Sequence, residues 1–128
     1  EPLPLLYEGN LMEKTVDIGG KEVFLKSSAM TPVIYRDAFG RDIFKAQSSI
    51  FALANKNIET AQNVDSVGIM EITWAMARTA DENTPEFLVW LDTLEAFPIF
   101  DVLKDIVELV MQNMTTTSRI KNVKAAGN

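Results

Sequence analysis

Two Arg-Asp pairs are the polar side chains whose spacing could do chemistry. They are Arg36-Asp37 and Arg41-Asp42, five residues apart within the segment TPVIYRDAFGRD (residues 31–42). Guanidinium and carboxylate groups form charge-assisted hydrogen bonds, so these pairs suit recognition of a partner. The chain contains no histidine and no cysteine, the side chains most used for catalysis near neutral pH and for binding soft metal ions. We therefore expect a protein that binds a partner and is not an enzyme.

Other motifs for catalysis or metal binding are weak. The carboxylate pairs Asp81-Glu82 and Asp101-Asp105 could in principle hold a hard cation. They lack the convergent oxygens and the glycine of a calcium loop, however. The pairs of adjacent serines have no histidine to activate them, and no glycine-rich phosphate loop followed by Lys and Ser or Thr occurs. We expect no catalytic residue, no bound metal and no cofactor.

The charged segment is predicted to lie on one helix. Asp37 and Arg41 are then four residues apart, and an ion pair along the helix is the plainest explanation of these charges. Gly40 in the interior of a helix costs about 1 kcal/mol relative to alanine. It therefore indicates either a kink or the close approach of another backbone. The aromatic residues Tyr35 and Phe39 are predicted to pack against the hairpin that precedes this helix.

That hairpin is indicated by residues 14–26, in which apolar and polar side chains alternate on both sides of Gly19-Gly20. Both central residues of a type I′ turn need a positive φ, which glycine adopts freely. The predicted buried face carries Val16, Ile18, Val23 and Leu25. Because a lone hairpin is marginal in water, this one must dock on helices.

Four helices are predicted after the hairpin. The first helix is predicted to start at Thr31-Pro32, where the threonine hydroxyl can cap the helix and the proline occupies the first helical position. Its apolar stripe, which ends before Asn55-Lys56-Asn57, is Tyr35, Phe39, Ile43, Ala46 and Ile50. The second helix starts at Asp65-Ser66 and is apolar on most sides, which is typical of the central helix of a bundle. A short helix starts at Thr84-Pro85-Glu86. A last helix follows Pro98, and its stripe is Ile99, Val102, Leu103, Ile106, Leu109 and Val110.

The predicted fold class is mainly α (α+β), a domain of about four helices with a short N-terminal β-hairpin. Residues 12–114 form this single domain. Residues 1–11 are expected to be either a non-native addition ahead of a natural start at Met12 or a genuine extended arm. Residues 115–128 are expected to form a flexible basic C-terminal tail.

Charge is unevenly distributed along a chain of formal net charge −6. Residues 57–118 hold eleven acidic residues against Arg78 and Lys104, whereas the last ten residues hold three basic residues and no acid. Negative charge repels phosphates, so we expect no nucleic-acid partner. The apolar runs fall well short of the roughly 20 residues that cross a bilayer, so no membrane partner is expected. The asymmetry favours head-to-tail contact between copies or a basic partner. The alternative is a solvated acidic surface that only aids solubility.

Around residues 31–42 the chain resembles a known family. A hairpin, a helix opening TP-x-x-YR-x-x-FGRD, two central helices and a terminal helix ending in Thr/Ser and Lys are similar to the tail assembly chaperones of long-tailed (siphovirus-type) bacteriophages and prophages of Gram-positive bacteria. The matching pieces are TPVIYRDAFGRDIFK, FLVWLDTLEAFPIFDVLKDIVELV and QNMTTTSRIKNVK. The resemblance covers about Glu13 to Lys124, and Pro98 departs from the family pattern.

The resemblance implies a function in virion morphogenesis. Such chaperones coat the tape-measure protein in the host bacterial cytoplasm, help to recruit tail-tube subunits and are absent from the mature virion. Many also exist in a longer form made by a ribosomal frameshift, which would fall near Thr115 here. A homo-oligomer, as a ring or spiral, is expected because many weak contacts give a reversible coat. The candidate partner-binding residues are Tyr35, Arg36, Phe39, Gly40, Arg41, Asp42, Arg119, Lys121 and Lys124. The alternatives are an acidic DNA mimic or inhibitor protein of a phage, and a structural tail component.

Overall fold

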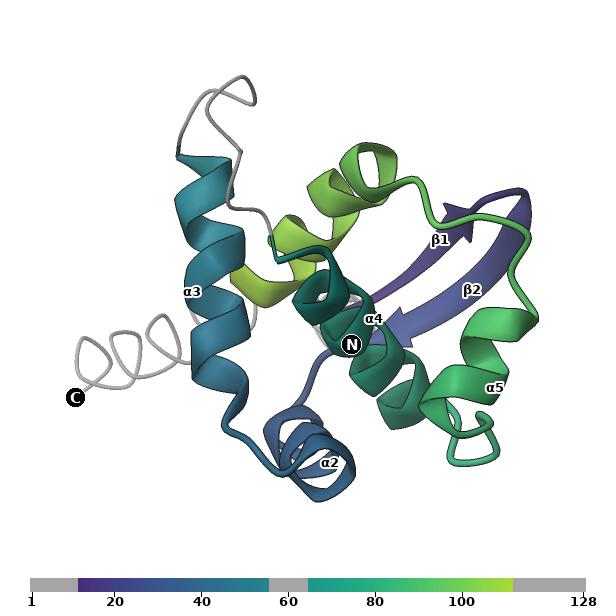
Figure 1. Ribbon diagram of the computed structural model, residues 1–128, viewed down its shortest axis with the longest axis horizontal. Coiled ribbons are helices and arrows are strands. Elements are labelled where there is room, and N and C mark those ends of the chain that lie inside the picture. The colour runs from purple at the N-terminus through teal and green to yellow at the C-terminus, as the bar shows by residue number, and fades with distance from the viewer. Residues whose placement is uncertain (1–11, 56–64, 112–128) are drawn as a thin grey trace, which may run out of the picture.

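The computed structural model describes residues 12–55 and 65–111 of the 128-residue chain. In these residues a two-stranded antiparallel sheet precedes five helices, which gather around the central helix α4 (Figure 1). The predicted fold class, mainly α with a short N-terminal hairpin, is confirmed. The fifth helix arises because the first predicted helix is two helices in the structure.

The hairpin consists of β1 (Glu13–Ile18) and β2 (Lys21–Lys26), with Val16 opposite Val23. Gly19 and Gly20 have φ of 60° and 92°, as a type I′ turn requires. The four residues predicted to share a face are all buried. Gly19 is also required for space, because a Cβ atom there would overlap the carbonyl oxygen of Ala96. The turn is thus held against the loop that precedes the last helix.

Two helices replace the single long helix predicted after the hairpin. They are α2 (Met30–Phe39) and α3 (Ile43–Ala54). Gly40 ends α2 in a left-handed conformation with φ of 70°, and its N–H donates to the carbonyl of Arg36 at 2.8 Å. Asp42 then caps α3, because its Oδ1 accepts from the N–H of Phe44 at 2.7 Å. The prediction of one helix through Gly40 is wrong. Gly40 neither kinks a continuous helix nor admits the close approach of another backbone, because it ends α2 and, among the described residues, no atom beyond its chain neighbours lies within 4 Å of where its Cβ would be.

The start of α2 also differs from the prediction. Ser28 Oγ accepts from the N–H of Met30, and Thr31 Oγ1 accepts in return from the N–H of Ser28, each at 3.1 Å. These hydrogen bonds tie Ser28 to the first turn of α2, which begins at Met30, one residue before the predicted start at Thr31. Thr31 itself is buried inside α2, where its hydroxyl lies 2.9 Å from that of Thr79.

Helix α4 (Ser66–Ala80) is the centre of the domain. The helix starts where it was predicted to start, and Asp65 caps it by accepting from the N–H of Gly68 at 2.8 Å. Nine residues of α4 are buried, on all sides of the helix: Gly68, Ile69, Glu71, Ile72, Thr73, Trp74, Ala75, Met76 and Ala77. The helix packs on β2, on α2 and on α3, which explains why it is apolar on most sides.

The last two helices close the core. Helix α5 (Phe87–Asp92) is short, and Trp90 is its buried residue. The helix begins at Phe87, directly after the predicted start at Thr84-Pro85-Glu86, and the Thr84 hydroxyl donates back to the carbonyl of Asp81 at 2.7 Å. The helix over residues 99–111 buries most of its predicted stripe: Val102, Leu103, Ile106, Leu109 and Val110.

An ion pair ties this last helix to the first strand. Lys14 Nζ lies 2.6 Å from Asp105 Oδ1 and 2.9 Å from Glu108 Oε2. The hydrogen bond to Asp105, followed by the one to Glu108, raises the pKa of Lys14 above its ordinary value. The two ends of the described chain are therefore joined directly.

Candidate partner-binding site

A polar cluster of Arg41, Glu71 and Tyr35 lies beneath the turn between α2 and α3. Arg41 makes a two-pronged contact, with Nη1 2.8 Å from Glu71 Oε1 and Nη2 2.7 Å from Oε2. The hydroxyl of Tyr35 donates to Oε1 at 2.7 Å and accepts from Arg41 Nη1 at 3.1 Å. The Glu71 side chain is 4% exposed and that of Arg41 is 54% exposed. Arg41 therefore covers a buried carboxylate from the solvent side.

This arrangement contradicts the predicted bridge between Asp37 and Arg41. Gly40 ends α2 one residue before Arg41, so the two side chains do not share a helical face. The left-handed turn directs the guanidinium to Glu71 on α4 instead. Arg41 thus serves to fasten the turn to the central helix.

Burial and charge also shift the ionisation of this cluster. Burial, followed by the hydrogen bond to Glu71, raises the pKa of Tyr35 well above its ordinary value. The hydrogen bond to Glu71 and its negative charge raise the pKa of Arg41. Tyr35 is therefore a neutral donor and Arg41 a cation at neutral pH.

We expect Tyr35 to make the fold sensitive to alkaline pH. Because its pKa is higher in the folded state than the ordinary value of 10.0, the stability it contributes is complete below pH 10 and is lost as pH rises toward the folded-state pKa. Urea unfolding at pH 8 and pH 11 should therefore show a smaller loss of stability in Tyr35→Phe than in the unsubstituted chain. Because other groups, Lys14 among them, affect the alkaline pH dependence of both chains equally, the measurement is the difference between the two chains and not the absolute slope. An equal loss of stability in both chains would show that Tyr35 does not contribute to the alkaline pH dependence.

An aromatic cluster lies beside the polar one. The ring of Phe39 is 4.8 Å from Tyr35, 5.4 Å from Trp74 and 5.2 Å from Phe87, measured between centroids. The partners of Phe39 are thus on α2, α4 and α5. These ring contacts involve helices alone, so the packing of Tyr35 and Phe39 on the hairpin stays a prediction.

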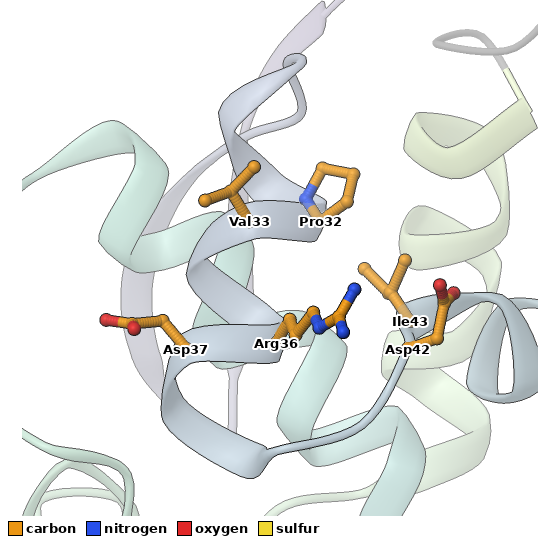
Figure 2. Close-up of a pocket in the computed structure, with 6 residues that line it drawn as sticks. All are labelled: Pro32, Val33, Arg36, Asp37, Asp42 and Ile43. Atoms are coloured by element: carbon orange, nitrogen blue, oxygen red, sulfur yellow. The ribbon is translucent and has the colours of Figure 1, made fainter.

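A groove opens on the outer side of the same turn. It has a volume of about 600 Å³ and is lined by Pro32, Val33, Arg36, Asp37, Asp42 and Ile43. In Figure 2, Arg36 extends from α2 toward the start of α3, where Asp42 and Ile43 lie, and Asp37 points away on the other side of α2. Val33 is 68% exposed. Apolar side chains with charges of both signs at the margin suit an amphipathic segment.

The structure sorts the predicted partner-binding residues into groups. Arg36 and Asp42 line the groove, whereas Tyr35 and Arg41 belong to the polar cluster, Phe39 to the aromatic cluster and Gly40 to the turn. Arg119, Lys121 and Lys124 lie outside the described residues.

Sequence reasoning missed Glu71 and the apolar lining of the groove, Pro32, Val33 and Ile43. A signal for Glu71 was available, because it is a single acid in the otherwise apolar stretch VGIMEITWAMA. A lone carboxylate at a buried helical position needs a partner, and a nearby arginine is the usual one.

The comparisons with known proteins add no relative: no protein-family model, no curated protein and no solved structure matches this chain. None of the helices in residues 12–55 and 65–111 is long and apolar enough to cross a bilayer. The site consists of a groove on the outer side of the α2–α3 turn and a hydrogen-bonded cluster that ties the turn to α4.

Proposed function

We propose that this protein is a tail assembly chaperone of a siphovirus-type bacteriophage or prophage. It would bind and coat the tape-measure protein in the host bacterial cytoplasm, help to recruit tail-tube subunits and leave before the virion is complete. One observation carries the proposal: the segment TPVIYRDAFGRD, which bears the resemblance, also builds the groove and its support.

The lining of the groove suits a client that presents amphipathic helices. Tape-measure proteins are long and rich in heptads, so they expose apolar stripes flanked by charges of both signs. Val33 offers an exposed apolar contact, and Arg36 and Asp42 supply one charge of each sign at the margin. A shallow groove of this kind supports weak binding, which displacement by tube subunits requires.

Reversible coating also needs many copies. Each copy contributes a weak contact, and the linked copies hold the client through effective concentration. A homo-oligomer in the form of a ring or spiral provides this. A longer frameshifted form, altered beyond Thr115, would add contacts to tail-tube protein without changing the groove.

Co-expression with the tape-measure protein of the same phage, followed by affinity capture, tests the proposal. Capture is expected for the full chain, and Val33→Ser should weaken it about fivefold through the loss of apolar burial. Val67→Ser is the matched control, because Val67 is also exposed, at 52%, but does not line the groove. No capture, or equal capture by both variants, would contradict the proposal. So would mass spectrometry that finds the protein in purified virions, which would indicate a structural tail component.

A further inference from the structure

Helix α5 presents two large aliphatic side chains to solvent. Leu88 is 75% exposed and Val89 is 57% exposed, whereas the next residue, Trp90, is buried. These two side chains lie outside the groove and outside the aromatic cluster. These two adjacent side chains form a small apolar surface that is open to a partner.

Carboxylates flank this aliphatic pair. Glu86 is three residues before Val89, and Asp92 is four residues after Leu88, the spacings at which side chains lie next to each other on a helix. Both carboxylates are exposed. Over residues 79–103 the sequence holds six acidic residues and neither lysine nor arginine. The surface of Glu86, Leu88, Val89 and Asp92, here the α5 patch, therefore requires an occupant that is both apolar and basic.

We infer that the α5 patch binds residues 119–124 of a second copy of this chain. That segment, RIKNVK, holds three basic residues and the aliphatic residues Ile120 and Val123. It is the most basic stretch of a chain whose net charge is −6. Its composition complements the patch in both respects: two aliphatic side chains meet two aliphatic side chains, and cations meet the flanking carboxylates.

The helix that leads to residues 119–124 ends away from α5, an arrangement that allows the contact to form between copies. Figure 1 shows the helix over residues 99–111 running away from α5 and ending on the opposite side of the molecule in that view. Arg119 follows eight residues after Met111, a span of at most about 28 Å when extended. Donor and acceptor are different surfaces, so the contact is head-to-tail and repeats from copy to copy. This deepens the proposed function by naming the contact that links the subunits, but it does not depend on the client.

Sedimentation velocity of the full chain without any client tests the inference. Self-association is expected to rise with protein concentration and to fall with added salt, which screens exposed charges. The substitution pair Leu88→Ser/Val89→Ser and the pair Glu86→Lys/Asp92→Lys should each weaken association about tenfold. Val67→Ser and Glu22→Lys are the matched controls, because they change an exposed aliphatic and an exposed acid elsewhere and should leave association unchanged.

Charge exchange between the two surfaces gives the decisive result. Lys121→Glu/Lys124→Glu should weaken association by itself and restore it when mixed with the Glu86→Lys/Asp92→Lys chain. Circular dichroism establishes that each variant is folded. A monomer at every concentration, or association that none of the α5 patch variants alters, would overturn the inference. Restoration only when both sets of changes are on one chain would also overturn it, since the contact would then be within a copy. Client capture is measured separately with Val33→Ser. The proposed function and the contact between copies can therefore each fail without the other.

Discussion

Replacing Arg41 with alanine is expected to destabilise the fold by about 3 kcal/mol, measured by urea unfolding at pH 7. The substitution leaves the carboxylate of Glu71 buried, with the Tyr35 hydroxyl still donating a hydrogen bond to it. Removing one member of a buried ion pair strands the other charge in a poorly solvated place. The expected loss is at the lower end for such pairs because Arg41 is half exposed, and water can enter where its side chain was.

Two further variants establish the cause. Arg36→Ala removes an exposed arginine from the same segment and should change the stability by less than about 0.5 kcal/mol. Adding Glu71→Gln to Arg41→Ala removes the stranded charge and keeps an acceptor for the Tyr35 hydroxyl, so this double variant should be more stable than Arg41→Ala alone. If the double variant were less stable, the loss would come from packing and not from the charge.

Replacing Phe39 with alanine is the second large effect, a loss of about 3 kcal/mol in the free energy of unfolding. Its ring contacts three other aromatic rings, those of Tyr35, Trp74 and Phe87. The substitution leaves a cavity among rings that are held by their own helices and cannot all move to fill it.

The control for this prediction is Phe44→Ala, because Phe44 is 66% exposed at the start of α3. It should cost less than about 1 kcal/mol. If both substitutions lowered the free energy of unfolding equally in thermal or urea unfolding, the aromatic cluster would contribute nothing to the stability of the fold. The comparison also separates the roles of Phe39, since a residue that serves only a partner would not alter the stability of the isolated protein.

The parts of the fold that were predicted correctly have local causes. Gly19-Gly20 between alternating residues is sufficient for the hairpin, and Asp65 before an apolar run is sufficient for the start of α4. The break between α2 and α3 was missed because Phe39 and Ile43 keep a spacing of four across it. Periodicity therefore continues through a turn of three residues. The usable signal was Gly40 followed by Asp42, a helix-ending residue and then a capping residue.

The site was predicted only in part, for a different reason. Proximity in sequence identified Arg36 and Asp42, which do line one groove. The partner of Arg41 is 30 residues away on α4, and no local pattern specifies which helix will lie beneath the turn. The pairing depends on how α2 packs on α4, which is a property of the assembled core.

The bridge from Lys14 to Asp105 and Glu108 has a consequence for synthesis of the protein. Lys14 and Glu108 are 94 residues apart in the sequence. The first strand therefore cannot make this contact until the helix over residues 99–111 has left the ribosome. A two-stranded hairpin by itself is marginal in water. The hairpin therefore gains this support only after the helix over residues 99–111 has been synthesised and has packed against it.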